Sequence, residues 1–346
     1  MDASRRLELG RREFLARTSA LGAASLLGLH YRSAAAEPPP ETTRIRFAHA
    51  PFICVAPQYL AEEFLPLEGF TEWNYLPVGS RTALDALAEG RADFAMWSSS
   101  ELLPHMDAGK SIVVLAGLHG GCYQLFGSER MRAIRDLKGK TAAIHYLGSG
   151  DHILLATMLA YVGINPQQDV TWITGKDLRN AMDLFVEGKA DAFVGYAQEP
   201  AELRLKKVGH VIVDTALDRP WSQYFCCMVV ANRDFAQRNP IATKRALRAI
   251  FKAADICAAE PERVARFLAA KLHEPRYPIG LEVMKRAQYA RWREANPEDT
   301  IRFHALRLHE VGMIKSDPNK LIAQGTDWRF LNELKKIGRA SCRERV

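Results

Sequence analysis

Clusters of small polar and aromatic side chains recur along the chain, and their chemistry suits the binding of a small molecule. Glycines and serines offer backbone N–H groups and hydroxyls for hydrogen bonds, and aromatic rings offer flat apolar walls. The ligand-binding candidates are His49, Phe52, Gly79, Ser80, Trp97, Ser98, Ser99, Tyr146, Gly148, Ser149, Asp151, Tyr196, Glu199 and Trp221. They predict a cleft that holds its ligand by hydrogen bonds and stacking, without a fixed ion pair.

Two acidic candidates leave the charge of the ligand open. If Asp151 and Glu199 both face the cleft, a ligand with hydrogen-bond donors is favoured, such as an aminopyrimidine or an amino-sulfonate. A buried carboxylate would repel an oxyanion. If both carboxylates turn away, an anion fits the same backbone N–H groups. Arg81 is the nearby cation, but it recurs as Arg179 in a repeated segment, which equally suits a structural role.

The six cysteines are predicted to be buried free thiols. They stand at positions 54, 122, 226, 227, 257 and 342, without C-x-x-C spacing and without histidines at metal-site spacing. Cys226 and Cys227 are adjacent in a predicted strand, where neighbouring side chains point to opposite faces, so a disulfide between them is disfavoured. We therefore expect no metal site and no cofactor.

Several signatures of enzymes are missing. The Gly-Lys-Thr segment 139–141 resembles the end of a P-loop, but Ile134 stands where that motif needs glycine, so the chain is not predicted to be an ATPase. Neither H-E-x-x-H nor G-x-S-x-G occurs. His304 and His309 are predicted on a helix surface. Ser98 with Glu101 also fits a capping box, which would give Ser98 a structural role.

Charge excludes a nucleic-acid partner. The formal net charge is +7, but residues 1–36 carry six arginines and three acidic residues, a net of +3. The remaining lysines and arginines are scattered singly, without a basic stripe interleaved with aromatics.

The N-terminus is predicted to be an export signal. Arg11 and Arg12 precede an uncharged apolar run, 18–29, which is followed by three alanines at 34–36. This order is typical of a secretory signal peptide, and the paired arginines indicate the twin-arginine route. A run of twelve apolar residues is too short to span a bilayer, which needs about 20. We expect a signal peptide over 1–36, a linker over 37–43 and no membrane insertion after processing. At the other end, residues 337–346 resemble a vector read-through, with Gly338 breaking a helical pattern.

Short apolar runs alternate with helix-patterned stretches over most of the chain, which predicts an α/β fold. The predicted strands are 44–49, 73–77, 92–97, 112–118, 123–126, 141–146, 170–173, 190–196, 211–213 and 224–229. From residue 240 to about 336 the pattern is helical only. In such sheets ligands bind at the carboxyl ends of strands, where most of the candidates stand.

An internal repeat indicates two similar lobes. Residues 81–93 match residues 179–191 at a constant offset of 98, and each copy ends in Glu-Gly-(Arg/Lys)-Ala-Asp. Each copy therefore predicts a helix that ends at a glycine and turns into a strand.

The repeat, together with the Asp-Leu-Lys-Gly-Lys-Thr segment 136–141, resembles the periplasmic substrate-binding proteins of nitrate/sulfonate/taurine-type ABC importers. The resemblance covers about 44–334 and implies a type II fold of two α/β lobes. Lobe one would be 44–127 plus 226–336 and lobe two 128–225, with crossing strands at 123–126 and 224–229 forming the hinge.

The resemblance also implies a function and partners. A monomer in the periplasm would capture a small organic or oxyanionic ligand and deliver it to a membrane permease with a cytoplasmic ATPase. The alternative is an enzyme on the same fold, similar either to a desulfinase with Cys54 as nucleophile or to a thiamine-pyrimidine synthase. The sequence favours the binding protein.

Overall fold

Two five-stranded sheets organise the protein. The computed structural model describes residues 37–50, 52–79, 82–196, 198–271 and 277–343, with side chains described up to residue 336. The first sheet has the order β2 (Glu72–Leu76), β1 (Arg44–Ala48), β3 (Phe94–Ser98), β10 (Cys227–Asn232), β4 (Ile112–His119). The second has the order β7 (Val170–Thr174), β6 (Lys140–Ile144), β8 (Ala192–Tyr196), β5 (Tyr123–Gly127), β9 (His210–Asp214).

The two sheets follow one plan. In each, the first three strands are parallel and the fourth is antiparallel to both of its neighbours. The fourth strand comes directly after the chain leaves the other sheet: β5 follows β4, and β10 follows β9. The chain therefore crosses twice between the sheets, in both cases next to these antiparallel strands.

All ten predicted strands are present, with ends shifted by a few residues. The largest shift is in β10, which was predicted over 224–229 and begins only at Cys227. Trp221–Gln223 forms a 3-10 turn, and the Phe225 N–H donates to the Thr300 hydroxyl (3.0 Å) instead of joining a strand. The backbone before Cys227 is therefore held partly by a distant helix, α12 (Pro297–Glu310).

The repeat forms equivalent units in the two sheets. Helices α3 (Ala83–Ala88) and α6 (Leu178–Val186) are followed by Gly90 and Gly188, whose φ angles are 71° and 72°. This left-handed conformation favours glycine after a helix.

The aspartate that ends each repeat connects its strand to the first strand of the same sheet. The Asp93 carboxylate accepts from the Arg46 N–H (2.7 Å), and the Asp191 carboxylate accepts from the Thr141 N–H (3.0 Å). In return, the Asp93 and Asp191 N–H groups donate to the carbonyls of Arg46 (2.8 Å) and Thr141 (3.0 Å). The repeat is thus one structural unit used in two sheets.

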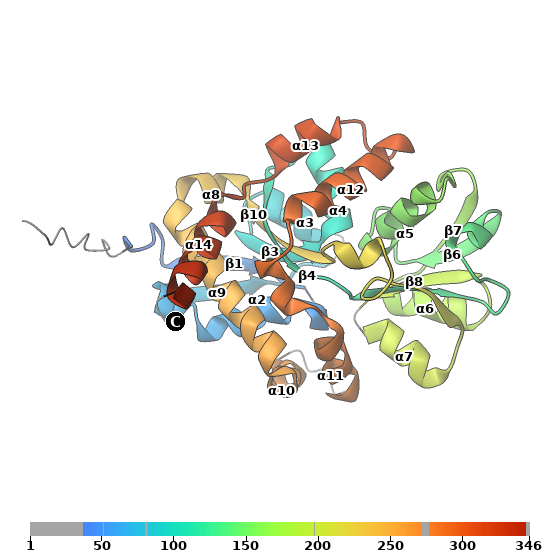
Figure 1. Cartoon of the computed structure of the whole chain (residues 1–346), viewed down its shortest axis with the longest axis horizontal. Coiled ribbons are helices and arrows are strands. Elements are labelled where there is room, and N and C mark those ends of the chain that lie inside the picture. The colour runs from blue at the N-terminus through green and yellow to red at the C-terminus, as the bar shows by residue number, and fades with distance from the viewer. Residues whose placement is uncertain (1–36, 51, 80–81, 197, 272–276, 344–346) are drawn as a thin grey trace, which may run out of the picture. The chain divides into compact units, whose positions relative to one another are not determined.

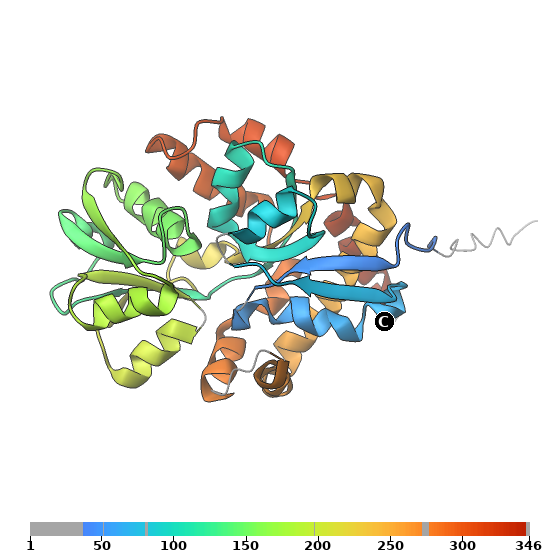
Figure 2. The same ribbon diagram turned by 180° about the vertical axis from the view of Figure 1, so that it is seen from behind.

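Helices surround both sheets (Figure 1). The second sheet lies with α5 (Gly150–Tyr161), α6 and α7 (Gln198–Lys206), drawn in green and yellow-green. In both views the remaining helices gather around the first sheet (Figure 2). They are α2 (Ala56–Leu60), α3, α4 (Ser99–Asp107), α8 (Arg233–Arg238), α9 (Pro240–Ala259), α10 (Pro261–Lys271), α11 (Tyr277–Arg286), α12 (Pro297–Glu310), α13 (Pro318–Gly325) and α14 (Arg329–Arg343). The predicted helical C-terminal part is confirmed.

Two sequence predictions about helices are wrong. Helix α14 continues through Gly338 to Arg343, so this glycine does not end the helix. His304 is buried, not exposed, because α12 packs against α5, and its Nδ1 lies 3.3 Å from the Thr157 hydroxyl. His309 is exposed, as predicted.

The predicted signal peptide, with Arg11 and Arg12, lies outside the described residues. Among the residues that are described, no helix combines the length and the apolar character needed to cross a membrane.

Candidate functional site

A small cavity lies where the two sheets meet. It has about 20 Å³ of room, space for roughly one water molecule. Its lining comes from both sheets and from the segments between them: Phe52, Cys54, Val55, Met96, Trp97, Ser98, Glu101, Cys122, Tyr123, Tyr196 and Cys227. Four of the predicted ligand-binding residues are therefore together: Phe52, Trp97, Ser98 and Tyr196.

Aromatic rings from both sides close over this cavity. The Phe52 ring centroid lies 5.0 Å from that of Tyr196 and 6.1 Å from that of Trp97, both in edge-to-face geometry. Tyr123, at the start of β5, lies 5.0 Å from Tyr196. Phe52 precedes a short helix beside β1, whereas Tyr196 ends β8 in the other sheet. The aromatic contact therefore joins the two halves.

Glu101 brings a carboxyl group to the cavity. It accepts a hydrogen bond from the Tyr146 hydroxyl (2.8 Å), and burial raises its pKa to about 7. The predicted capping box is absent, since the Ser98 side chain makes no cap hydrogen bond to α4. Ser98 instead accepts from the Tyr123 hydroxyl (2.9 Å).

Asp151 lies next to this carboxyl group, at the start of α5. It is fully buried, and one carboxylate oxygen accepts from the His145 N–H (2.7 Å). The other carboxylate oxygen has no hydrogen-bond partner among the described atoms. Burial raises the pKa of Asp151 to about 6, and its charge raises the pKa of Glu101 further. Glu199, at the start of α7, is also buried.

The two halves approach closely at Gly150. The Ser100 hydroxyl donates to the Gly150 carbonyl (3.1 Å). A Cβ atom at Gly150 would lie 2.8 Å from both the Ser98 Oγ and the Tyr123 hydroxyl, which is too close. Only glycine fits this contact without a shift of the neighbouring atoms.

Other predicted residues lie near the cavity without lining it. Ser99 donates its hydroxyl to the Phe225 carbonyl (2.7 Å) and, with Trp221, lines a neighbouring cavity that shares Tyr123. Trp221 packs between Tyr161 and Phe303.

The remaining candidates hold turns or stand apart. The Ser149 hydroxyl donates to the Tyr146 carbonyl (2.6 Å), and the Gly148 N–H donates to His152 (3.0 Å), so both shape the turn before α5. His49 packs beside Tyr59, and Gly79 is exposed. Ser80 lies outside the described residues.

The cysteines correct one expectation from the sequence, that all of them are free thiols. Cys122 and Cys226 form a disulfide across 104 residues and so join the two segments that cross between the sheets. Cys54, Cys227 and Cys257 are buried and free, as predicted. No histidine stands at metal-site spacing from these cysteines in the sequence, but His119 lies beside Cys54, Cys122 and Cys227 in space.

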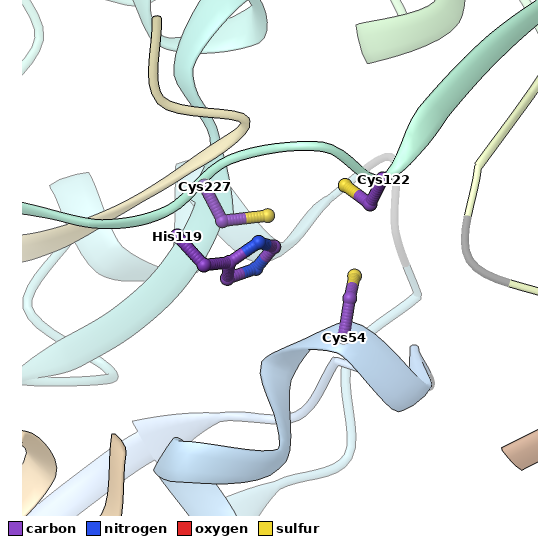
Figure 3. A group of neighbouring side chains, drawn as sticks. All are labelled: Cys54, His119, Cys122 and Cys227. Atoms are coloured by element: carbon purple, nitrogen blue, oxygen red, sulfur yellow. The ribbon is translucent and has the colours of Figure 1, made fainter. Parts of the chain in front are cut away.

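Figure 3 shows Cys54, His119, Cys122 and Cys227 converging from different segments. One possible ligand atom from each residue lies within 4.8 Å of the others, an arrangement that can hold a metal ion. The Cys227 thiol holds the pKa of Cys54 below its usual value.

Sequence reasoning missed Glu101, Cys122, His119 and Tyr123 as site residues. Glu101 was considered only as a capping partner, and Cys122 and His119 were separated from the other cysteines by tens of residues. A usable signal was present in the strand order, because the first crossing between the sheets carries His119, Cys122 and Tyr123 in one short segment.

The comparisons with known proteins agree on the fold. The nitrate-binding protein of Synechocystis PCC 6803 superposes with a TM-score of 0.71 at 15% identity, covering 87% of this chain and 90% of that one. The alkanesulfonate-binding protein of Xanthomonas axonopodis pv. citri, bound to MOPS, gives 0.64 at 19% identity, covering 85% and 100%. A desulfurization enzyme gives 0.56 at 14% identity, covering 84% and 98%. The chain has the periplasmic-binding-protein fold, which binding proteins and an enzyme share.

Sequence comparison gives a family. Residues 75–264 match the model of a family described as NMT1/THI5 like. A 4-amino-5-hydroxymethyl-2-methylpyrimidine phosphate synthase of Saccharomyces cerevisiae is 25% identical over 199 residues, covering 54% of this chain and 57% of the relative. The chain thus spans little more than half the length of that curated relative.

Proposed function

Because the chain belongs to the NMT1/THI5-like family and has the periplasmic-binding-protein fold, we propose that it is the solute-binding component of an ABC importer. It captures a small ligand between two lobes and delivers it to a membrane permease driven by a cytoplasmic ATPase. The single observation that carries this proposal is the cavity at the junction of two sheets built on one plan. A ligand held there contacts both lobes and so favours their closure.

Residues 44–127 with 226–336 form lobe one and residues 128–225 form lobe two in this proposal. The hinge consists of the segments that lead into β5 and β10, which are the two places where the chain passes between the sheets. Motion at two adjacent crossings lets the lobes separate without breaking either sheet.

The cavity supports a ligand that donates hydrogen bonds. Glu101 lines it and Asp151 lies beside it, while its described lining contains no lysine, arginine or histidine. Such a site repels nitrate or a sulfonate once Glu101 is ionised, and it suits a flat molecule with amino groups. Because Phe52 and Tyr196 contact each other and the cavity has room for about one water molecule, such a ligand enters when the lobes move apart and then stacks on these rings. An aminopyrimidine without a phosphate group has this chemistry, and the phosphate ester named for the curated yeast relative contains such a ring.

Calorimetry with a small panel tests the proposal. A 4-aminopyrimidine, an amino-sulfonate, a plain alkanesulfonate and nitrate are titrated into the processed protein. The aminopyrimidine should bind with 1:1 stoichiometry, and Glu101→Gln should weaken it by about 1.5–3 kcal/mol, typical of hydrogen bonds to charged groups. Tight binding of nitrate or sulfonate, unchanged in Glu101→Gln, would contradict the ligand class. No binding by any probe would contradict the solute-binding role.

Export by the twin-arginine route places the protein in the periplasm in this proposal. Arg11→Lys with Arg12→Lys should leave the precursor in the cytoplasm, as detected by fractionation and immunoblotting. Normal processing in a strain without the twin-arginine translocase would refute the route.

An enzyme on the same fold is the second candidate, and one observation favours it. The Cys54 thiol lines the cavity next to Cys227 and His119, where it can reach a bound substrate. Turnover of a sulfinate or a pyrimidine precursor that Cys54→Ala abolishes, while Cys257→Ala preserves it, would establish the enzyme over the binding protein.

A further inference from the structure

Four side chains that can ligate a metal meet beside the cavity. Cys54 comes from the short helix Ile53–Val55, His119 from the end of β4, Cys122 from the connection to β5 and Cys227 from the start of β10. All four are at most 8% exposed. Figure 3 shows the Cys54 side chain directed toward Cys122, with His119 and Cys227 side by side. Three different parts of the chain thus supply one compact group.

His119 has the orientation expected of a metal ligand. Its Nδ1 lies 3.4 Å from the Gly120 carbonyl, a contact that favours a proton on Nδ1. Its Nε2 is buried and has no hydrogen-bond partner among the described atoms. Metal-bound histidines commonly donate one ring N–H to a carbonyl and ligate through the other nitrogen. A buried nitrogen without a partner is costly, and a bound cation would satisfy it.

We propose that Cys54, His119 and Cys227 bind a Zn²⁺ ion at this junction. Tetrahedral zinc with Zn–S bonds of about 2.3 Å and Zn–N bonds of about 2.0 Å places its ligand atoms roughly 3.5–3.8 Å apart. The ligand atoms here lie within 4.8 Å of one another, so a closure of about 1 Å completes the geometry.

Charge selects Zn²⁺ over a monovalent ion such as Cu⁺. On binding, the Cys54 and Cys227 thiols each release a proton to solvent, and the two thiolates with neutral His119 balance the charge of Zn²⁺. A neutral complex suits a buried position whose described cavity lining offers no lysine or arginine. Cu⁺ with two thiolates would leave a buried negative charge.

Cys122 decides whether a fourth position is open. In the disulfide with Cys226 it cannot ligate, so the zinc keeps one position free toward the cavity that Cys54, Cys122 and Cys227 all line. Three protein ligands with an exchangeable fourth position are typical of zinc sites that bind small molecules. Treatment with a phosphine reductant frees Cys122 to become the fourth ligand.

Metal titration of the processed, chelator-treated protein tests the site. Zn²⁺ competing with a chromophoric chelator should bind with 1:1 stoichiometry. Cys54→Ser, Cys227→Ser and His119→Ala should each weaken it by at least ~100-fold, since even the loss of an outer-shell partner costs ~10–100-fold. Cys257→Ser is the matched control, because Cys257 is also buried and free but lies outside the group. The double variant Cys122→Ser/Cys226→Ser should retain the metal.

Co²⁺ substitution and X-ray absorption test the site in the wild-type protein, whether or not the variants fold. The wild-type protein should show the visible bands of tetrahedral Co²⁺ with a thiolate-to-metal charge-transfer band. The zinc edge should report two sulfur ligands, and three after reduction. Absence of sulfur ligation in folded wild type, or full zinc affinity in folded Cys54→Ser or Cys227→Ser, would overturn the site. Loss of zinc in Cys122→Ser/Cys226→Ser would overturn the three-ligand assignment. None of these readouts depends on the transported solute.

Discussion

At the residue scale, the Glu101 carboxyl group makes the stability of the protein depend on pH. Its pKa rises from the usual 4.5 to about 7 because the group is buried. The folded protein therefore keeps a proton that the unfolded chain releases between these values. The contribution of Glu101 to the free energy of unfolding is therefore fully present below pH 4.5, and it is lost as the pH rises from 4.5 through about 7.

Glu101→Gln should remove this pH dependence. Glutamine keeps an acceptor for the Tyr146 hydroxyl but cannot ionise. The free energy of unfolding of the wild type, relative to the variant, should fall by about 3 kcal/mol between pH 4 and pH 8. Urea unfolding followed by circular dichroism measures it. A wild-type-minus-variant difference that stays constant with pH would show that Glu101 does not carry the effect. Asp151, whose pKa is also raised, titrates in both proteins, and because its charge interacts with that of Glu101 the difference reports Glu101 together with this coupling.

At the element scale, the repeated helix–glycine–strand unit explains the likeness of the two sheets. In both copies a left-handed glycine lets the chain turn from the helix into a strand whose first backbone groups pair with the neighbouring strand. The repeated aspartate fixes that pairing. The two segments that match at an offset of 98 residues therefore share one backbone geometry.

Gly188→Ala should destabilise the protein through backbone conformation alone. The φ angle of Gly188 is 72°, and no atom lies within 4 Å of a Cβ placed there. We expect a loss of about 1 kcal/mol, since alanine disfavours this conformation. Gly280→Ala is the control: Gly280 lies in α11 with open space around its Cβ position and no positive φ. That change should instead stabilise by about 0.5–1 kcal/mol. Equal effects at both glycines in urea unfolding would contradict this explanation.

At the scale of the whole molecule, the disulfide joins the two segments that cross between the lobes. Cys122 and Cys226 lie 104 positions apart in the sequence, and the segment between them includes all of the proposed second lobe. In the unfolded chain this bond closes a loop and so restricts its conformations, and in the folded protein it lies outside both sheets. It should therefore stabilise the native state while leaving the hinge in place.

Cys122→Ala with Cys226→Ala should lower the free energy of unfolding by about 5 kcal/mol, as chain entropy predicts for a loop of roughly 100 residues. Unfolding in urea with a chelator present, with and without reductant, measures the difference. Reductant should weaken the wild type and leave the double variant unchanged. Equal stability of wild type and variant without reductant would show that the disulfide contributes nothing to folding.

The contact at Gly150 should control closure of the lobes. A Cβ atom there would meet the Ser98 Oγ and the Tyr123 hydroxyl at 2.8 Å, so Gly150→Ala pushes the halves apart. Small-angle scattering should give a larger radius of gyration for the variant. Ligand affinity should fall on the order of tenfold, equivalent to ~1.4 kcal/mol. Gly188→Ala, at the opposite end of β8 from Tyr196 and with open space around its Cβ position, should change neither quantity. Wild-type scattering and affinity in Gly150→Ala would show that the lobes close without this contact.

The strands, the helical C-terminal part and each copy of the repeated unit could be predicted from the amino-acid sequence because they depend on patterns within about ten residues, such as apolar runs and a glycine after a helix. The aromatic candidates Phe52, Trp97 and Tyr196 were also found this way, because parallel strands bring their carboxyl ends to one edge. The family of folds was expected from the resemblance to known binding proteins.

Only the tertiary structure decided which polar groups meet at the junction. The Glu101–Tyr146 hydrogen bond, the Cys122–Cys226 disulfide and the group around His119 join residues that are far apart in the chain. The Glu101–Tyr146 contact depends on how the two sheets dock, whereas the cysteines and His119 meet through the packing of β4, β10 and the short helix Ile53–Val55 beside the first sheet. Spacing along the sequence carries no information about either arrangement. Burial then shifts the pKa of Glu101 and leaves His119 Nε2 without a partner among the described atoms, and both effects arise only when the folded chain excludes water from these groups.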